Sequence, residues 1–385
     1  MWPCFALEKV CNVEYGTRVV RKKDQGTLYP VYGGGGKTFS VDHINRSDRV
    51  VIARFAMSAQ CTRIVDGEFF LNDSGLTISS LSVELIRQDF LDWYVLGLNE
   101  TIYALGRGTA QRNLDVDAFR KIAISVPPIP EQQSIVAILD QAFADIEKAR
   151  ANAEQNLKNA RELFDSYLQQ VFSQRGEGWV EETLGQATGG VYTGPFGSLL
   201  HKSDYIENGI PLVNPAHITK TGILADKNKS VSLGVVERLS NYVMREGDIV
   251  IGRRGEMGRC ALVTKKEDGF LCGTGSFFIK SSSRCYGGYL VRFLRSVSCK
   301  AQLEAIAGGA VMPNLSNKDL SSFALYLPSY ERQKELATEI ALVAKRTRNL
   351  VNVYETKISS LDELKKSLLQ KAFSGELTKG EGRAA

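Results

Sequence analysis

Two stretches of the chain carry apolar residues at steps of three and four, the spacing that keeps one face of an α-helix apolar. The first runs from Glu131 to Ser173 and contains neither glycine nor proline. At a rise of 1.5 Å per residue it predicts one uninterrupted helix of roughly 65 Å, far longer than a helix of a compact domain. Such a helix needs a partner to cover its stripe, and the second stretch, from Glu331 to Leu377, supplies one.

The two apolar stripes have similar lengths and spacings. In the first stretch the stripe consists of Ile135, Ile138, Ala142, Ile146, Ala149, Ala153, Leu157, Ala160, Phe164, Tyr167 and Val171. In the second it consists of Leu336, Ile340, Val343, Thr347, Leu350, Tyr354, Ile358, Leu361, Leu364, Leu368 and Ala372. The linkers after each stretch are short, so the second helix can cover the first only by running back along it. We therefore predict an antiparallel pair.

The two stretches are also copies of each other, offset by 200 to 201 residues. Their starts match as Pro130-Glu131-Gln132-Gln133 against Tyr330-Glu331-Arg332-Gln333, and their ends match as Phe172-Ser173 against Phe373-Ser374. An internal duplication has to be recognised before any fold is proposed, because it doubles every element of the fold.

The segments between the helices repeat as well. Residues 1 to about 130 contain strand-like runs at Val50 to Phe55 and Leu76 to Ile78, a glycine run at Gly33 to Gly36, and a helical pattern near Val83 to Leu98. Matching landmarks recur between residue 179 and about residue 328. We predict an α+β fold in which two mixed α/β domains are separated by a long antiparallel two-helix coiled coil, with a pseudo-two-fold internal repeat.

Composition narrows the class of protein. A length of 385 residues with 43% hydrophobic residues predicts two to three domains with real cores. Seven cysteines without a C-x-x-C pair, together with three histidines, argue against a disulfide framework or a zinc site. Neither a signal-peptide pattern nor a long apolar run occurs, so we expect a soluble, cytoplasmic, reduced protein. The formal net charge of +5 permits nucleic-acid binding without proving it.

Motifs of common catalytic sites are missing from the sequence. It contains no phosphate-binding P-loop, H-E-x-x-H, G-x-S-x-G or dinucleotide fingerprint. The nearest approach to an adenine-methyltransferase Asn-Pro-Pro-Tyr pattern is Val213-Asn214-Pro215-Ala216, which lacks the aromatic residue. These observations disfavour an enzyme.

Cationic residues cluster near glycine-containing loops in both predicted domains. In the first domain these are Arg18, Arg21, Lys22, Lys23, Lys37, Arg54, Arg107 and Arg112. In the second they are Lys202, Lys220, Arg253, Arg254 and Arg259. Such residues suit DNA, because phosphate contacts supply affinity and a planar arginine can pair with both acceptors of guanine. Each charge taken singly is more often ordinary solvated surface.

The repeated order of domains and helices resembles the specificity (S) subunit of type I restriction-modification systems, the HsdS family, over essentially the whole chain. The supporting motifs are the two proline-to-helix junctions, the two helix ends, and two loop patterns typical of recognition domains. These are Pro127 to Gln133, Pro328 to Gln333, Phe172-Ser173, Phe373-Ser374-Gly375, Thr193-Gly194-Pro195-Phe196-Gly197-Ser198 with Gly209 to Asn214, and Tyr29 to Gly36. The resemblance adds Phe196, Ser198 and Asn214 to the candidate DNA-binding residues.

The resemblance implies a division of the chain and a role. Target-recognition domains would occupy residues 1–130 and 176–330, spacer helices residues 131–175 and 331–375, and a tail residues 376–385. The helix residues expected at the spacer or subunit interface are Ile135, Ile138, Ile146, Leu157, Phe164, Leu336, Ile340, Val343, Leu350, Ile358, Leu361 and Leu368. The chain itself would hold no cofactor and catalyse nothing.

By the same resemblance, each domain reads one half of a bipartite DNA target and the helices set the spacing between the halves. Two modification subunits would methylate adenine with S-adenosylmethionine, and restriction subunits would use ATP and Mg²⁺. The first domain lacks the Gly-Pro-Phe-Gly-Ser loop. It is also shorter, because Ile52 follows Pro30 by 22 positions whereas Ile251 follows Pro211 by 40. The target is therefore expected to be asymmetric.

Two alternatives of other classes stay open at this point. One is an enzyme, such as a DNA methyltransferase or nuclease fused to recognition domains, which methylation by the chain alone would support. The other is a coiled-coil protein–protein adaptor without sequence-specific DNA binding. Association with DNA that is insensitive to salt, or absent, would favour the adaptor, since phosphate-dominated binding weakens steeply with salt.

Overall fold

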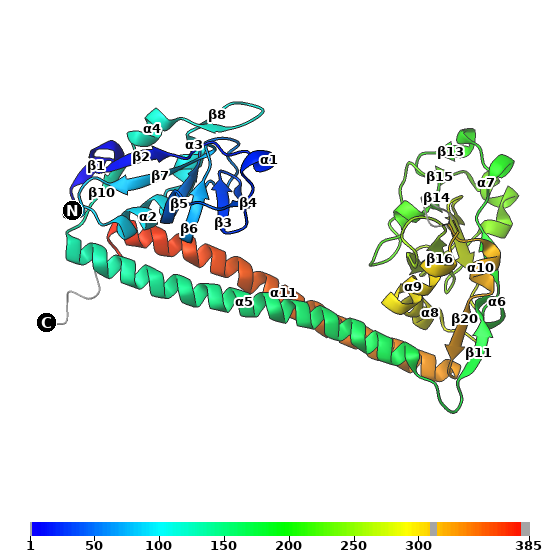
Figure 1. Ribbon diagram of the computed structural model, residues 1–385. Coiled ribbons are helices and arrows are strands. Elements are labelled where there is room, and N and C mark those ends of the chain that lie inside the picture. The colour runs from blue at the N-terminus through cyan, green and yellow to red at the C-terminus, as the bar shows by residue number, and fades with distance from the viewer. Residues whose placement is uncertain (1, 309–313, 379–385) are drawn as a thin grey trace. The chain divides into compact units, whose positions relative to one another are not determined.

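The computed structural model describes residues 2–308 and 314–378, apart from the side chain of Ser198 (Figure 1). The chain forms two compact units. Unit 1 combines residues 1–154 with residues 355–385, and unit 2 consists of residues 155–354. Both units share two long helices, α5 (Ile129–Ser173) and α11 (Tyr330–Ser374).

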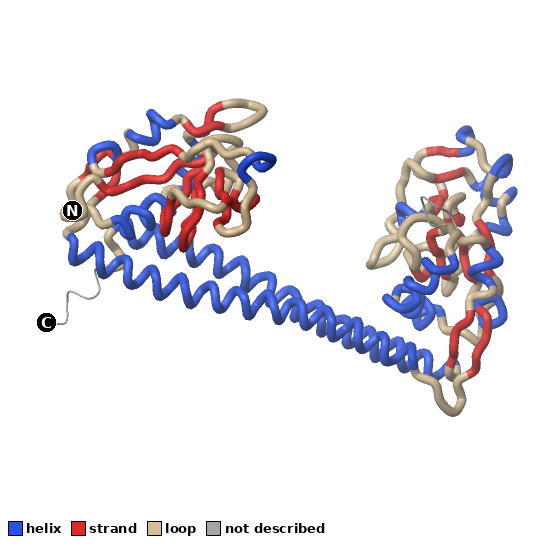
Figure 2. Tube along the Cα trace, in the orientation of Figure 1, coloured by secondary structure: helices blue, strands red, loops and turns tan. Residues whose placement is uncertain are grey.

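The two long helices confirm the prediction of uninterrupted helices. Each contains 45 residues, and the starts and the ends of the two differ by 201 positions. In unit 1 the beginning of α5 lies beside the end of α11 (Figures 1 and 2), where Lys365 pairs with Glu147 and Arg150 pairs with Asp362. In unit 2 the end of α5 packs against the beginning of α11. The helices therefore run antiparallel within each unit.

The predicted apolar stripe is correct along α5, where every one of its residues is buried or half-buried. In α11 the prediction is wrong at Leu350 and Leu364, which are each 45% exposed. An α-helix has 3.6 residues per turn, so a stripe continued by steps of three and four drifts off the covered face. The half-buried residue at each place is the next one along, Val351 or Lys365.

Unit 1 is built on one six-stranded sheet. Helix α2 (Gln88–Gly97) lies on the side of this sheet that faces the long helices (Figure 2). The strand order is β2-β7-β5-β6-β3-β4, and all neighbours are antiparallel except β3 and β6. The strands are β2 (Cys11–Tyr15), β3 (Tyr29–Gly33), β4 (Gly36–Val41), β5 (Arg46–Ala53), β6 (Thr62–Leu71) and β7 (Gly75–Ser80). The strands predicted around Val50 and Ile78 are confirmed.

The helix predicted near Val83 begins only at Gln88, because the preceding residues form turns in which the amide of Ile86 donates to the carbonyl of Ser82. The remaining elements of unit 1 are short. They are β1 (Cys4–Ala6), η1 (Leu7–Lys9), α1 (Arg21–Asp24), α3 (Asn99–Ala104), β8 (Gly106–Arg107), β9 (Asn113–Leu114), α4 (Val116–Arg120) and β10 (Ala123–Ser125).

Unit 2 has two four-stranded sheets with the orders β12-β19-β16-β17 and β13-β15-β14-β18. Its strands are β11 (Val180–Thr183), β12 (Val191–Thr193), β13 (Tyr205–Ile206), β14 (Ile210–Val213), β15 (Ser230–Val231), β16 (Ile249–Gly252), β17 (Cys260–Leu262), β18 (Leu271–Cys272), β19 (Ser276–Ile279) and β20 (Ala324–Leu327). Its helices are α6 (Leu184–Ala187), η2 (Gly197–Leu199), η3 (Lys202–Asp204), η4 (Pro215–His217), α7 (Leu233–Arg238), η5 (Ser240–Tyr242), α8 (Gly287–Arg295), α9 (Val297–Ile306) and α10 (Asn317–Ser321).

The topologies show the repeat directly. The order β2-β7-β5-β6 in unit 1 corresponds to β12-β19-β16-β17 in unit 2, and the parallel pair β3–β6 corresponds to β14–β18. The ten-residue strand β6 is replaced in unit 2 by the two short strands β17 and β18. The longer segment between β14 and β16 forms α7 and its neighbours.

A buried glutamine fixes the start of each long helix to its own domain. Gln132 Nε2 donates to the carbonyls of Leu85 and Pro127, and its Oε1 accepts from the amide of Arg87 at 2.8 Å. Gln333 makes the same three bonds, to the carbonyls of Arg284 and Pro328 and from the amide of Tyr286. The structural partner of Gln333 is therefore Gln132. The sequence alignment that matched it with Gln133 is wrong by one residue.

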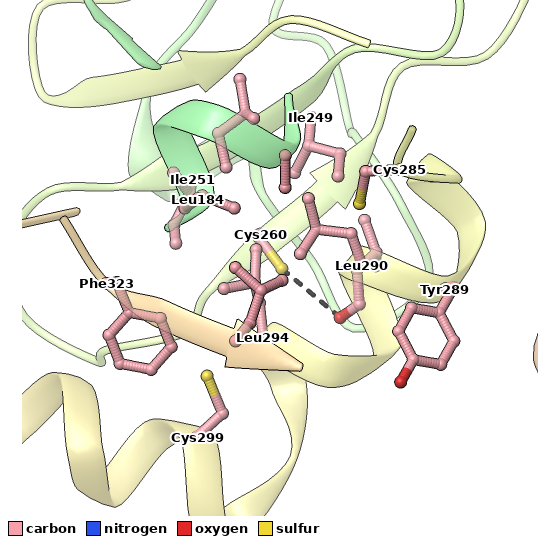
Figure 3. Packing of buried hydrophobic residues seen from close by; sticks show 14 of the residues in the cluster. Leu184, Ile249, Ile251, Cys260, Cys285, Tyr289, Leu290, Leu294, Cys299 and Phe323 are labelled. Carbon is pink, nitrogen blue, oxygen red and sulfur yellow. Dashed lines mark hydrogen bonds between the residues drawn. The ribbon is translucent and has the colours of Figure 1, made fainter. Parts of the chain in front are cut away.

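The C-terminal end of each long helix packs into the hydrophobic core of the domain that belongs to the other repeat. In unit 2 Phe172 of α5 lies with its ring centroid 5.4 Å from those of Tyr289 and Phe293, and it belongs to the buried cluster of which Figure 3 shows a part. In unit 1 Phe373 of α11 makes the corresponding contacts with Phe90 and Tyr94. Each domain is thus packed against the beginning of one long helix and the end of the other.

Asp92 on α2 gives unit 1 a pH-dependent stability. Burial raises the pKa of its carboxyl from 3.8 to about 6, although the amide of Val50 and Gln88 Nε2 donate to it. A raised carboxyl pKa stabilises the fold below about pH 4, and this contribution disappears as the pH rises through about 6.

We expect the unfolding free energy of unit 1 to fall by about 2 to 3 kcal/mol over this pH range, and we expect Asp92→Asn to abolish that pH dependence. Urea unfolding of both proteins between pH 4 and 7 tests this; parallel profiles contradict it.

Among the described residues, no helix is both long and apolar enough to cross a membrane.

Candidate nucleic-acid interface

In unit 1 five loops converge where the central strands end. Backbone hydrogen bonds tie the loop after β5 to the β6–β7 turn, from the amide of Arg54 to the carbonyl of Ser74, and to β9, from the amide of Leu114 to the carbonyl of Arg54. The glycine turn joins them, because the amide of Gly34 donates to Ser74 Oγ. Gly16, the residue directly after β2, joins them as well, because its amide donates to the carbonyl of Gly75. The loops therefore form one connected surface.

Arg54 lies at the centre of this surface between two aromatic rings. Its guanidinium carbon is 4.8 Å from the ring centroid of Tyr15 and 4.5 Å from that of Phe55. Both aromatic residues are also exposed to solvent, Tyr15 by 42% and Phe55 by 38%. Stacking of this kind holds a guanidinium plane in place while its donors stay accessible, and bases can stack on the same rings.

Two more arginines, Arg112 and Arg63, belong to this surface. Arg112 packs 4.7 Å from the ring centroid of Tyr103. Arg107 lies on β8 and pairs with Asp115, which offsets its charge. Arg63 was not predicted, yet its Nη2 donates to the carbonyl of Gly34 in the glycine turn. Burial lowers the pKa of Arg63. Arg63 is the second residue of β6, and the fold brings its guanidinium to this surface.

Unit 2 builds the same surface with matching backbone contacts. The amide of Arg253 donates to the carbonyl of Gly275, and the amide of Leu315 donates to the carbonyl of Arg253. Arg253 therefore occupies the place of Arg54, directly after the central strand β16.

The side chains at this place differ from those in unit 1. Asn314 Oδ1 accepts from Arg253 Nε at 3.2 Å and from Arg254 Nε at 3.4 Å, and Arg253 lies 5.8 Å from the ring centroid of Phe277. A bond to Nε orients the guanidinium plane, which is the requirement for two parallel bonds to a base edge. The sequence repeats the pair Asn113-Leu114 as Asn314-Leu315, and this repetition could have pointed to Asn314. Only the contacts in the structure show that Asn314 binds the two arginines.

One glycine in each unit permits a close approach of two loops. A Cβ on Gly16 would lie 1.9 Å from the carbonyl oxygen of Asn72, and a Cβ on Gly194 would lie 2.0 Å from that of Gly273. Gly194 belongs to the Gly-Pro-Phe-Gly-Ser loop, whose Phe196 is 59% exposed. The glycine thus positions the loop, and Phe196 is the group that the loop presents to solvent.

The structure places the predicted DNA-binding residues in two groups. Arg54 and Arg112 in unit 1, and Arg253, Arg254 and Asn214 in unit 2, belong to the converging loops. The others are exposed on separate elements or have their charge offset. Arg18, Arg21, Lys22, Lys23 and Lys37 lie on and around α1 and β4, Lys202 lies on η3, Lys220 is exposed, Arg107 pairs with Asp115, Arg259 pairs with Glu256, and the side chain of Ser198 lies outside the described residues.

Comparisons with known proteins agree with this architecture. The family described as type I restriction modification DNA specificity domain matches residues 1–155 and 197–349. The specificity subunit of the type I restriction enzyme MjaVIII from Methanocaldococcus jannaschii is 23% identical over 333 residues, covering 81% of this chain and 76% of the relative. That of EcoKI from Escherichia coli K12 is 22% identical over 301 residues, covering 72% of this chain and 62% of the relative.

Two solved structures share the fold at low sequence identity. A chain from a type I restriction-modification system, studied for complex assembly and conformational transition, has a TM-score of 0.75 at 18% identity, covering 97% of this chain and 98% of that one. The HsdS subunit from Thermoanaerobacter tengcongensis has a TM-score of 0.57 at 17% identity, covering 97% of each chain. With most of its residues matched by the family in two segments, the chain belongs to the type I restriction modification DNA specificity domain family.

Proposed function

We propose that this chain selects the DNA target of a type I restriction-modification complex, each globular domain reading one half of a bipartite sequence. The observation that carries the proposal is the pair of arginines, Arg54 and Arg253, which follow the central strands of the two repeats with the same backbone contacts. Arginine on a connected loop surface, with neighbouring aromatic rings, suits base recognition in a groove of DNA.

The different surroundings of the two arginines support an asymmetric target. Arg54 is stacked between Tyr15 and Phe55, whereas Arg253 shares Asn314 with Arg254. A single stacked guanidinium and a pair of hydrogen-bonded guanidiniums present different donor patterns to base edges. The two half-sites would therefore differ in sequence.

Catalysis would reside in partner subunits. Two modification subunits would methylate adenine with S-adenosylmethionine, and restriction subunits would use ATP and Mg²⁺. The antiparallel helices α5 and α11 offer these partners a shared scaffold, and their fixed length of 45 residues would set the spacing between the half-sites. A cytoplasmic location fits this role, since the target is genomic DNA.

Long-read methylome sequencing of the host, with the gene intact and with it deleted, tests the proposal. We expect the deletion to remove one bipartite adenine-methylated motif and to leave every other methylated motif unchanged. Restoring the gene on a plasmid should restore the same motif. An unchanged methylome in a host that expresses the partner subunits would contradict the proposed function.

A further inference from the structure

The same contact between domain and long helix occurs in both units and can be compared position by position. Helix α2 in unit 1 corresponds to α8 in unit 2 with an offset of 199, since Phe90 and Tyr94 meet Phe373 as Tyr289 and Phe293 meet Phe172. The long helices correspond with an offset of 201.

In unit 1 large side chains fill the space between α2 and α5. Trp93 Nε1 donates to Asp140 Oδ1 at 2.8 Å, and the Trp93 ring lies 4.5 Å from that of Phe143, centroid to centroid. Lys365 of α11 extends over the other side, with Nζ 5.5 Å from the Phe143 centroid. Two aromatic rings therefore occupy this place in the fold.

In unit 2 the corresponding positions leave a cavity. Arg292 replaces Trp93, Ala341 replaces Asp140, and Ala344 replaces Phe143. The cavity has a volume of about 380 Å³. Its apolar walls are Phe164, Leu168, Val291, Ile340, Ala341 and Ala344. We call this the unit 2 groove. In unit 1 this place in the repeat holds the phenyl ring of Phe143, whose position is Ala344 in unit 2, so the groove has room where unit 1 has an aromatic ring.

The rim of the unit 2 groove is positively charged. Arg292, Arg295 and Arg348 line it, together with the single carboxylate of Asp165. Arg295 is held by the uncharged carbonyls of Thr219, Lys220 and Cys260, and Arg292 donates to the carbonyl of Gly288. Three guanidiniums against one carboxylate leave two positive charges around an apolar floor, an arrangement that attracts a ligand with carboxylates beside an apolar group.

The corresponding surface of unit 1 has the opposite sign. A pocket of about 600 Å³ beside Trp93 is lined by Asp48, Asp66, Asp89, Asp92 and Asp140, against two arginines, Arg49 and Arg87. A segment that fits the unit 2 groove would be repelled from unit 1 and would find its aromatic site already filled. The two repeats are therefore unequal at this contact although their backbones match.

We propose that the unit 2 groove binds a protein segment that presents an aromatic side chain flanked by acidic residues. The apolar walls bury the ring, and Arg292, Arg295 and Arg348 meet the carboxylates, so both affinity and selectivity come from residues of α5, α8 and α11. This inference goes beyond the proposed DNA recognition and does not depend on it, because the groove contains none of the candidate DNA-binding residues.

The test titrates the full chain into a fluorescein-labelled peptide of the sequence Glu-Asp-Trp-Asp-Glu and follows fluorescence polarisation. We expect binding with a Kd below about 1 mM, weakened about tenfold or more in Ala344→Phe, which places in the groove the ring that unit 1 has at Phe143. Arg348→Glu should weaken binding by a similar factor, and because Arg348 is exposed this variant leaves the packed interface intact. Replacing the tryptophan of the peptide by alanine should have a comparable effect.

Arg346→Glu is the matched control, since Arg346 is exposed on the same helix but two residues, and so about 200°, away from Arg348. It should bind the peptide as the unaltered chain does. The proposal is overturned if the peptide fails to bind at about 1 mM, or if Ala344→Phe and Arg348→Glu both bind it normally. It is equally overturned if sedimentation shows that a second copy of the chain covers the groove and that Ala344→Phe releases it. DNA methylation is measured in a separate experiment, so a failure of peptide binding can be distinguished from a failure of the proposed DNA recognition.

Discussion

Replacing Gln132 by alanine is expected to lower the free energy of unfolding of unit 1 by about 3 kcal/mol, because it removes three hydrogen bonds made by a side chain with no exposure to solvent. The amide of Arg87 would lose its acceptor, and the carbonyls of Leu85 and Pro127 would lose their donor. Each buried polar group left unpaired costs about 1 to 3 kcal/mol, and water entering the space would recover part of that.

Urea denaturation combined with hydrogen exchange of the Arg87 amide measures this effect. That amide should exchange about a hundredfold faster in Gln132→Ala, since it reports the lost bond directly. Gln133→Ala is the control. Gln133 is the exposed neighbour of the same residue type, so its removal should change stability by less than about 0.5 kcal/mol. Equal losses of unfolding free energy in Gln132→Ala and Gln133→Ala would show that the buried glutamine does not fix the start of the helix.

Replacing Arg253 by alanine is expected to reduce recognition of one half-site by about 10- to 100-fold and to leave the other half-site unchanged. Arg253 lies only in unit 2, and Asn314 holds its guanidinium together with that of Arg254. Competition binding against DNA libraries randomised in each half-site, with the modification subunits present, gives the two effects separately.

Arg245→Ala provides the matched control at the other end of the same strand. Arg245 precedes β16 whereas Arg253 follows it, and Arg245 is exposed and paired with Asp268. It should leave base preference unchanged at both half-sites. Equal weakening of both halves by Arg253→Ala, with a smaller salt dependence, would instead identify a general phosphate contact.

The long helices and the repeat could be predicted from sequence because their signals are local or periodic. An apolar stripe needs only helix geometry, and duplicated words such as Phe172-Ser173 and Phe373-Ser374 need only comparison. The one-residue error at the helix start arose because the motif offers two adjacent glutamines, Gln132 and Gln133. Only the three long-range hydrogen bonds of Gln132 distinguish them.

The candidate site could be predicted only in part, because it is made of contacts between distant loops. Arg54 and Arg253 were found as cations near glycines. Their environments, the rings of Tyr15 and Phe55 in one case and Asn314 in the other, join residues up to 61 positions apart. Arg63 was missed for the same reason, since nothing around it in the sequence indicates that its guanidinium reaches Gly34.

The packing of Phe373 against Phe90 and Tyr94 has a consequence for synthesis on the ribosome. Unit 2 is continuous in sequence, from residue 155 to residue 354, and can complete its core while translation proceeds. Unit 1 is encoded first but needs residues beyond 354, so its hydrophobic surface waits for the last helix to emerge. The domain made first is finished last, so the core of unit 1 stays incomplete while the residues of unit 2 are being synthesised.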